Sequence, residues 1–515
     1  MASKGFFSHG LPPMSWELGA CSGSGLTLSQ LRFTIAFVAS VAVGAILRHV
    51  PTVKGRHIFS LVAGFLLIYY PFGNGTFHAL IPSLAAYVCM RRFRRSCGLL
   101  AWLVAFPYLI LAHVMQASGA AWKEGQFDFT GAQMVLTLRL IAVAVSYQDG
   151  ACPPGQLREY AARKRLLQLP SPLEFFSYLF AAGNLLAGPF FEAHDYKDYI
   201  ERKGEWDESD PAKRIPNPLL PGLARFVKGC ICAVLWMKLS QPYGADLLES
   251  KYFQQEVGLP HRLFLLWIVG LAARCKYYFA WAVAESSLIF SGLCYNGRNA
   301  DGRPLWNRYI NSRIRRVEFN ASLPNLAANW NVCTGLWLRH YVYERLTPVD
   351  KRPTFATLAI TQLISGIWHG LFPGYWLFFA TSAIMFEAGK AIYRYEQGWP
   401  PRVRRFAPYV VLKVAFNALI LNYAASSFIV LWLSDCLAIW RSVYYCGHLA
   451  ILTIIAVGMV LPPRKPKRDV KPEKAAAAAA AGKVDGVEAA PAVPAVPVGM
   501  PVAPVLATAV EKKEL

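Results

Sequence analysis

Charged side chains are scarce in this chain of 515 residues. Asp, Glu, Lys and Arg together make up 16% of the sequence, whereas roughly 25% is usual for a soluble domain. Hydrophobic residues make up 55%, and the mean hydropathy is +0.31. So much apolar surface cannot be buried in a water-soluble core and needs lipid as its solvent. This composition excludes a cytosolic enzyme and a disordered interaction hub.

Acidic side chains are scarcer than basic ones. The sequence has 31 Asp and Glu against 53 Lys and Arg, which gives a formal net charge of +22. In a membrane protein this excess is typical of the cytosolic loops, which are rich in Lys and Arg. We therefore expect the membrane bilayer, and no nucleic acid, as the partner of these basic side chains.

Several motifs of soluble enzymes and metal proteins are missing. The 11 cysteines are scattered and form no CxxC pair, which argues against a disulfide framework and against a zinc site. The chain also has no P-loop, no GxSxG nucleophile elbow and no HExxH zinc motif. We expect no bound metal.

Long apolar runs take the place of these motifs. A helix needs about 20 apolar residues, or 17 to 25, to cross the hydrocarbon core. Several runs are shorter, so we expect roughly 9 to 11 spans, with other runs re-entrant or packed inside the bundle. The predicted fold class is all-α, a polytopic transmembrane helical bundle. The runs occupy residues 33–47, 58–72, 77–90, 96–116, 129–147, 172–191, 229–244, 263–271, 277–293, 319–338, 355–386, 407–433 and 444–463.

Basic residues alternate along the first five runs. Loops 48–57, 91–95 and 148–170 each contain at least three Lys or Arg, whereas loop 71–78 contains none and loop 117–128 contains only one. Cytosolic loops carry the excess of Lys and Arg in membrane proteins. This pattern predicts a lumenal N-terminus.

The sequence divides into three parts. Residues 1–27 form a lumenal N-terminal segment, residues 28–463 contain the apolar runs, and residues 464–515 form a tail rich in Ala, Pro and Val. The tail begins with a basic cluster and has too little apolar content to pack, so we predict that it is disordered and cytosolic. Near its end, Lys512 and Lys513 form a dilysine signal for retrieval to the endoplasmic reticulum.

One run contains a histidine at membrane depth. Run 355–386 has no charged side chain and one imidazole, His369. As a straight helix it would be about 48 Å long, compared with a hydrocarbon core near 30 Å. We therefore expect a break at Pro373-Gly374, one turn after His369. A histidine at such depth usually faces the bundle interior or a water-filled cavity, and a structural hydrogen bond is the alternative interpretation.

Two other runs contain polar side chains. Run 319–338 is rich in amides, with Asn320, Asn325, Asn329 and Asn331, and such groups are costly to expose to lipid. Glu285 lies within run 277–293, where an intramembrane carboxylate is a candidate site residue. The alternatives are interhelical hydrogen bonds for the amides and a structural, ion-paired role for the carboxylate.

The segments around Asn331 and His369 carry a family resemblance. Residues 330–331 (WN), 337–346 (WLRHYVYERL) and 367–375 (IWHGLFPGY) resemble motifs of the membrane-bound O-acyltransferase family, and within it the plant-type lysophospholipid acyltransferases. Residues 276–279 (KYYF) and 187–189 (AGP) fit the same group. The similarity covers about residues 28–463.

The resemblance implies a helical bundle around a catalytic tunnel. Acyl-CoA would enter from the cytosol and a lysophospholipid from the bilayer, to meet at Asn331 and His369. An imidazole can accept the proton of a glycerol hydroxyl as it attacks the thioester. Asn331 can hold the hydroxyl, orient the imidazole or donate to the developing oxyanion. Exchange of a thioester for an ester requires no cofactor.

Further residues are candidates for substrate binding. Arginines at the cytosolic side can bind the phosphates of CoA, although ordinary positive-inside charge explains them equally. The candidate substrate-binding residues are Trp330, Trp368, Tyr375, Glu285, Arg315, Arg316 and Arg339.

Two alternative functions remain open at this stage. One is an acyltransferase of the same family that acts on a neutral lipid such as diacylglycerol or a sterol. The other is a proton-coupled transporter that uses His369 and Glu285 as a relay. The head-group preference, the acyl-chain preference and the oligomeric state are open as well, with a homo-oligomer among the options.

Overall fold

The computed structural model describes residues 10–116, 127–181, 185–209, 214–349, 351 and 353–461. In these residues the chain is helical, and the β-contacts amount to one isolated antiparallel bridge between Arg298 and Pro304. The all-α fold class predicted from the sequence is confirmed. The tail 464–515 with its dilysine pair and the first nine residues of segment 1–27 lie outside the described residues.

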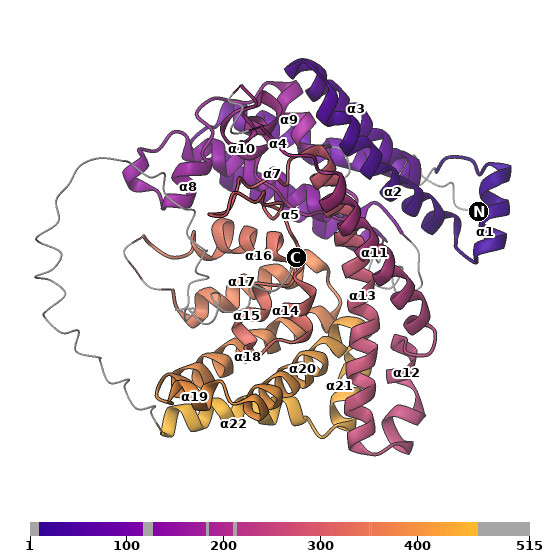
Figure 1. The fold of residues 1–515 in the computed structure, drawn as a ribbon, viewed down its shortest axis with the longest axis vertical. Helices are drawn as coiled ribbons and strands as arrows, with labels where there is room; N and C mark the ends of the chain where they lie inside the picture. Colours follow the sequence, from indigo (N-terminus) through magenta and orange to yellow (C-terminus); the bar gives the residue numbers. More distant parts are fainter. Residues whose placement is uncertain are drawn as a thin grey trace, which may run out of the picture.

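The elements follow one another from one side of the molecule to the other (Figure 1). Those of the N-terminal half are α1 (Ser15–Ser24), α2 (Leu28–His49), α3 (Val53–Phe72), η2 (Gly73–Ala79), α4 (Leu80–Arg92), α5 (Cys97–Gln116), α7 (Thr130–Asp149), η3 (Pro154–Gln156), α8 (Glu159–Lys164), α9 (Pro172–Leu179), α10 (Ala193–Glu201), η4 (Gly204–Trp206) and α11 (Leu219–Ser240).

The C-terminal half contains three long helices, α13, α18 and α20, and several shorter ones. Its elements are α12 (Ala245–Glu249), η6 (Tyr252–Glu256), α13 (Leu259–Ser291), α14 (Ile314–Glu318), α15 (Leu323–Ala327), α16 (Val332–Leu338), η7 (Arg339–Tyr343), α17 (Phe355–His369), α18 (Pro373–Gln397), α19 (Pro401–Arg404), α20 (Ala407–Val430), α21 (Leu433–Ser442) and α22 (Cys446–Val460).

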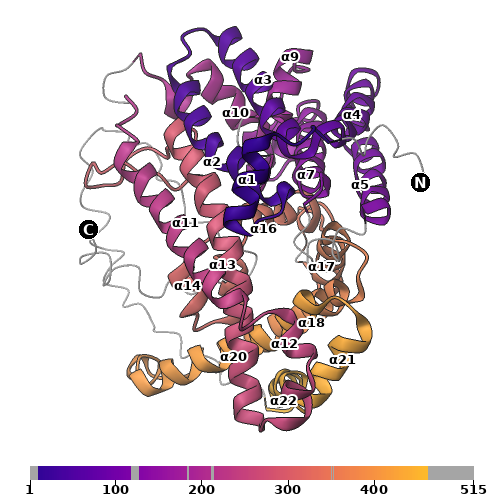
Figure 2. The same cartoon turned by 90° about the vertical axis from the view of Figure 1, so that its right-hand side faces the viewer.

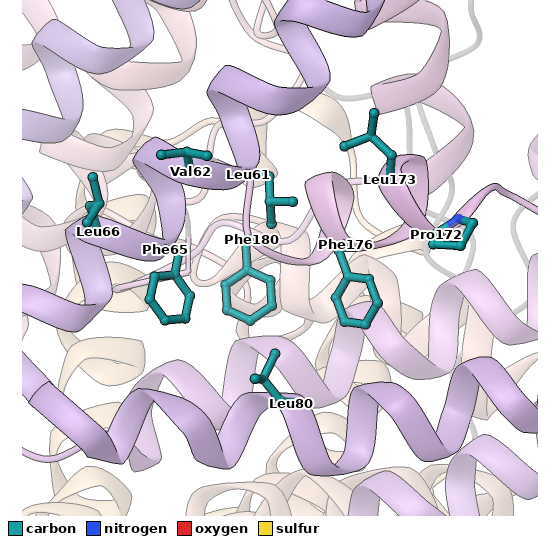
Figure 3. A pocket seen from close by; sticks show the side chains of 9 residues that line it. All are labelled: Leu61, Val62, Phe65, Leu66, Leu80, Pro172, Leu173, Phe176 and Phe180. Atoms are coloured by element: carbon teal, nitrogen blue, oxygen red, sulfur yellow. The ribbon is translucent and has the colours of Figure 1, made fainter.

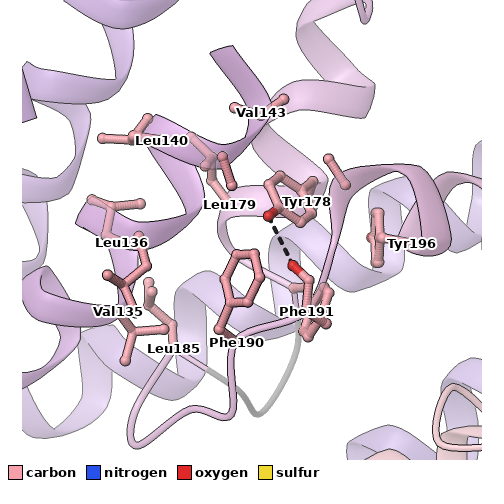
Figure 4. Packing of buried hydrophobic residues seen from close by; sticks show 14 of the residues in the cluster. Val135, Leu136, Leu140, Val143, Tyr178, Leu179, Leu185, Phe190, Phe191 and Tyr196 are labelled. Atoms are coloured by element: carbon pink, nitrogen blue, oxygen red, sulfur yellow. Dashed lines mark hydrogen bonds between the residues drawn. The ribbon is translucent and has the colours of Figure 1, made fainter. Parts of the chain in front are cut away.

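Helix α7 forms the centre of the larger apolar core. It is apolar on every side, as is typical of a helix surrounded by protein, and 94% of its membrane-spanning window is buried. Figure 4 shows Leu136 and Leu140 pointing toward Leu179 and Phe190. Arg139 is the one fully buried cation of α7. It donates to the carbonyls at the C-terminal end of α9, where a cation complements the helix dipole.

Helix α13 connects the two halves of the bundle. Its 33 residues span about 50 Å, and it packs against α2, α11 and α20 (Figure 2). Small residues allow the close approach to α2. A Cβ at Gly44 would lie 2.5 Å from the carbonyl oxygen of Ser287, so only glycine fits this crossing.

The number of candidate spans is lower than expected. Seven helical stretches of the described residues are long and apolar enough to cross a membrane, or eight if the bent pair α21 and α22 is one span. Runs 58–72 and 77–90 form one continuous stretch of 40 residues. Run 172–191 is helical only as far as Leu179, and run 319–338 contains just α15 and α16. Pro and Gly residues interrupt these runs, so apolar length overestimated the spans.

The basic loops lie together at one end of the bundle. Nη2 of Arg94 donates to the carbonyl of Leu167 at 2.8 Å, and Nη2 of Arg158 donates to that of Thr347 at 3.1 Å. Nη1 of Arg345 is 2.8 Å from Oδ1 of Asp149. In Figure 1 this end, with α8 and α19, is on the left, and α1 is on the right. Loops 91–95 and 148–170 are therefore on the same side, as their shared composition predicted.

Candidate active site

His369 is the last residue of α17, at a break in the helical path. Gly370 has a φ of 136°, a backbone conformation that residues other than glycine rarely adopt. Helix α18 then begins at Pro373. The predicted break of run 355–386 is confirmed. Because α17 has 15 residues, it rises about 22 Å. It thus carries His369 well into the bundle from the end at which α17 begins.

Aromatic rings surround the imidazole of His369. Its centroid lies 4.9 Å from the ring of Phe428, 5.3 Å from that of Phe379 and 5.8 Å from that of Tyr375. Within the part of the chain that the structure describes, neither ring nitrogen has a hydrogen-bond partner, and the side chain is half-buried. Both nitrogens are therefore available to a substrate, which the structural interpretation did not anticipate.

Trp368 fixes this turn of α17. Its indole nitrogen donates to the carbonyl of Met134 on α7 at 2.9 Å, and its own carbonyl lies 3.1 Å from Nε2 of His113 on α5. Trp368 is buried, so it supports His369 from behind rather than lining an open surface. The sequence prediction placed Trp368 among the substrate-binding residues, and this geometry favours a supporting role.

Asn331 lies in a loop just before α16, not within a helix. Its φ and ψ are 46° and 48°, the left-handed conformation that Asn adopts more readily than most residues. Because the helical path is interrupted at Asn331, one helical wheel cannot describe the four asparagines of run 319–338. Asn325 is exposed, and Asn329 is buried with its amide on the carbonyl of Asn325. The tertiary fold, and not helical spacing, selects Asn331.

Asn311 holds Asn331 from a neighbouring segment. Its Nδ2 lies 3.1 Å from Oδ1 of Asn331, and it is 1% exposed. The backbone nitrogen of Asn311 in turn donates to Oε1 of Glu285 at 2.6 Å. Sequence reasoning missed Asn311, because it lies outside the amide-rich run and belongs to no motif quoted for the resemblance.

Glu285 supports this arrangement through its carboxylate. Its carboxylate accepts hydrogen bonds from the backbone nitrogens of Asn311 and Ser312, and its Oε2 lies 3.1 Å from Nη1 of Arg225. Oε1 thereby holds the loop before Asn331, and Oε2 is paired with a cation on α11. Arg225 was also missed, since nothing in the sequence of α11 shows which of its three cations, Arg225, Lys228 or Lys238, has a partner on α13.

Trp330 packs within an aromatic cluster on α13. Its ring centroid is 4.8 Å from that of Trp281, 5.5 Å from that of Tyr278 and 5.8 Å from that of Tyr277. Trp330, the residue before Asn331, is thus held by three aromatic side chains of α13.

The comparison with known proteins agrees with these motifs. Residues 114–431 match the model of the MBOAT, membrane-bound O-acyltransferase family. The chain belongs to the membrane-bound O-acyltransferase family. Asn331 and His369 both lie within the matched residues, so the resemblance based on their surroundings is confirmed at the level of the family.

Relatives of the acyltransferase span almost its whole length. Lysophospholipid acyltransferase 1 of Arabidopsis thaliana is 38% identical over 461 residues, which are 88% of this chain and 98% of that protein. Lysophospholipid acyltransferase 2 of the same plant is 37% identical over 449 residues, 86% and 96% of the two chains. A lysophospholipid acyltransferase of Schizosaccharomyces pombe is 29% identical over 446 residues, 84% and 87%.

The three arginines proposed for CoA lie on different elements of the acyltransferase. Arg315 and Arg316 are exposed on α14. Arg339 donates through Nε to Oε1 of Glu344 at 2.7 Å, and its buried Nη1 has no hydrogen-bond partner among the described residues. Burial by itself would raise the pKa of Glu344, but His340 and Arg339 lower it to about 2. Arg339 is thus partly engaged in its own motif.

A second buried carboxylate, Glu192, lies outside the candidate spans. It accepts hydrogen bonds from the hydroxyls of Tyr341 at 2.6 Å and Tyr160 at 2.8 Å. The ring of Tyr160 stacks on His340, with centroids 3.5 Å apart. Burial raises the pKa of Glu192 to about 6. Glu192 thereby links the block 337–346 to α8 and α10, which no sequence motif indicated.

A lateral groove lies elsewhere on the acyltransferase. It has a volume of about 520 Å³ and opens between α3, α4 and α9 (Figure 3). Its lining is entirely apolar and contains none of the predicted site residues. The catalytic tunnel implied by the family resemblance is a different feature and stays a prediction. The groove is lined by Leu61, Val62, Phe65, Leu66, Leu80, Pro172, Leu173, Phe176 and Phe180.

Proposed function

We propose that this acyltransferase transfers an acyl group from acyl-CoA to the free glycerol hydroxyl of a lysophospholipid. The main support is the state of His369 in a chain that belongs to a family of O-acyltransferases. Neither of its two ring nitrogens has a hydrogen-bond partner among the described residues. The relatives named lysophospholipid acyltransferase, which match 84–88% of the chain, support the substrate class.

The chemistry follows from a neutral imidazole beside an ester-forming hydroxyl. The hydroxyl oxygen bonds to the thioester carbonyl carbon while its proton passes to His369. The carbonyl electron pair moves onto its oxygen and forms a tetrahedral oxyanion. When the oxyanion collapses, the carbon–sulfur bond breaks and the CoA sulfur takes the proton from the imidazolium. The products are a phospholipid and free CoA, and His369 is regenerated.

Phosphates of CoA require cations at the mouth of the site. Arg339 is the strongest candidate, because its Nη1 is buried without a partner among the described residues and a guanidinium suits phosphate oxygens. Arg315 and Arg316 are exposed and can serve the same ligand. In this scheme acyl-CoA arrives from the basic end of the bundle, and the lysophospholipid arrives from the bilayer.

The cellular setting is part of the proposal. We expect the endoplasmic reticulum membrane, which the dilysine pair Lys512 and Lys513 supports. The Lys and Arg of the loops support a cytosolic basic end and a lumenal N-terminus. Residues 464–515 are expected to serve localisation and not chemistry. The reaction as written balances without a metal or a redox cofactor.

The test is acyl transfer by the purified full-length protein in detergent or nanodiscs. Lysophosphatidylcholine, lysophosphatidylethanolamine, lysophosphatidylserine and lysophosphatidic acid are each offered with several acyl-CoAs, and phospholipid product is measured by mass spectrometry. Diacylglycerol and a sterol serve as competing acceptors. Product from a lysophospholipid that depends on acyl-CoA is expected. Product from only the neutral acceptors, or from none, would overturn the proposal.

A further inference from the structure

Asn311 uses all of its polar groups to hold the loop that carries Asn331. Besides donating to Glu285, its backbone accepts from the nitrogen of Val332 at 2.8 Å. Its side-chain Oδ1 accepts from the backbone nitrogen of Cys333 at 3.0 Å, and its Nδ2 reaches Oδ1 of Asn331. The two residues are 20 positions apart, so Asn311 fixes the start of α16 from outside.

These partners determine which way each amide points. The backbone nitrogen of Cys333 can only donate, so the atom of Asn311 that faces it must be the amide oxygen. The other terminal atom of Asn311 is therefore the NH₂ group, which can only donate. Its partner on Asn331 must then be the amide oxygen. The NH₂ group of Asn331 is left over, and it has no hydrogen-bond partner within the described part of the chain.

We propose that Asn311 is a positioning residue that directs the NH₂ group of Asn331, and not its carbonyl, toward the reacting thioester. Asn331 then donates a hydrogen bond to the oxyanion that forms when the hydroxyl oxygen bonds to the carbonyl carbon. This inference rests on the proposed acyl transfer and decides among the roles that the sequence left open for Asn331.

Burial makes the opposite orientation costly. If the amide of Asn331 were turned over to aim its carbonyl at the substrate, its NH₂ group would face the NH₂ group of Asn311. Asn311 would then lose its acceptor in a site where it is 1% exposed. An unpaired buried donor is strongly disfavoured.

Aspartate variants distinguish a donor from an acceptor. In Asn331→Asp the side chain still accepts from Asn311, but its second oxygen cannot donate to an oxyanion. We expect kcat to fall at least as far as in Asn331→Ala, by about 100- to 1000-fold. As the pH falls, protonation restores a donor, so the ratio of the Asp rate to the Ala rate should rise. An acceptor role would instead leave Asn331→Asp with near wild-type kcat.

The Asn311→Asp variant tests positioning. Its carboxylate still accepts from Cys333, but it can no longer donate to Asn331, so the Asn331 amide turns over and presents its carbonyl to the substrate. We expect kcat of the folded fraction to fall by about 100-fold, with KM for both substrates close to wild type. The thermal midpoint should fall as well, because the new carboxylate is buried. The matched control is Asn329→Asp, whose amide bonds only within its own turn and whose kcat should stay near wild type.

The outcomes separate this inference from the proposed function. Absence of transfer by the wild-type protein overturns the proposed function itself. With an active wild type, unchanged kcat in Asn331→Asp, or a change confined to KM in Asn311→Asp, overturns the inference. If Asn311→Asp does not fold, Asn331→Asp still decides, because it keeps every contact that Asn331 makes in the folded chain.

Discussion

The indole groups of Trp337 and Trp368 donate to two carbonyls of α7 that lie one helical turn apart. Nε1 of Trp368 is 2.9 Å from the carbonyl oxygen of Met134, and Nε1 of Trp337 is 3.0 Å from that of Leu138. Trp337 belongs to α16, the helix that follows Asn331. Trp368 belongs to α17, the helix that ends at His369. A single buried helix therefore sets the position of both motif segments.

Replacing Trp368 by Phe tests this attachment. The variant removes the indole donor and leaves the Met134 carbonyl its bond within α7, so we expect a loss of about 1 kcal/mol in the free energy of unfolding. We also expect kcat to fall about tenfold, since a displacement of 1 Å can cost about 100-fold. Trp337→Phe removes a similar bond farther from His369. We therefore expect a larger loss of kcat in Trp368→Phe than in Trp337→Phe. Thermal unfolding and turnover are measured for both variants, and equal kcat values would contradict this expectation.

His369→Ala should abolish acyl transfer in a folded protein. Loss of a general base costs about 100- to 10,000-fold in rate, and no hydrogen bond within the described residues is lost with this side chain. His448→Gln is the control, because its ring is engaged by the hydroxyls of Tyr423 and Thr381. That variant should lose stability and keep kcat in the folded fraction. Turnover by His369→Ala near that of wild type would remove His369 from the mechanism.

The Arg225–Glu285 pair should contribute to stability more than to chemistry. Arg225→Met leaves a carboxylate that is 1% exposed without its cation, and removal of one partner of such a pair costs about 3 to 5 kcal/mol. The double variant Arg225→Met, Glu285→Gln has a neutral side chain that can still accept from Asn311. We expect it to recover part of the lost stability. If the double variant is no more stable than Arg225→Met, the ion pair between Arg225 and Glu285 does not contribute to stability as expected.

Glu192 should make stability depend on pH. Burial raises its pKa from 4.5 to about 6, so the folded state binds this proton more tightly than the unfolded state does. The resulting stabilisation is fully present below about pH 4.5 and is lost as the pH rises through about 6, a change of about 2 kcal/mol. Glu192→Gln cannot titrate and should lack this change. The free energy of unfolding of wild type and of Glu192→Gln is measured at about pH 5 and 7.5. The same dependence on pH in both proteins would contradict the prediction.

Residues 464–515 should be dispensable for catalysis. A tail with so few apolar residues outside its Ala and Val repeats has little to pack against the bundle. A truncation after Lys465 is expected to retain acyl transfer in microsomes, with a rate per folded molecule within about twofold of wild type. The full-length chain measured in the same membranes is the reference. An inactive truncation that is still inserted would assign the tail a role in the reaction.

Local sequence information predicted much of this architecture. Apolar runs indicated a membrane bundle, and the combination of a long run with Pro373-Gly374 indicated the break after His369. The motif around Trp330 and Asn331 indicated the acyltransferase family. These features depend on hydrophobicity, proline and glycine within one segment, and such short-range properties do not require knowledge of the fold.

The number of spans and the geometry around Asn331 required the structure. A helical wheel failed at Asn331, because the loop before α16 takes its conformation from Asn311 on another segment. Arg225 could not be identified as the partner of Glu285, since nothing in α11 marks which cation will face α13. In each case the deciding contact joins residues 20 or more positions apart.

The amino-acid sequence by itself determined that this chain is a membrane-embedded helical bundle and which histidine lies at the helix break, because hydropathy and backbone restrictions act locally. Only the tertiary structure decided that Glu285 is a support and that Asn311 holds the carbonyl of Asn331. Among the residues that the structure describes, the NH₂ group of Asn331 is then left without a partner. Hydrogen bonds between distant segments form only after the helices pack, and a buried amide then has a single orientation that satisfies every partner.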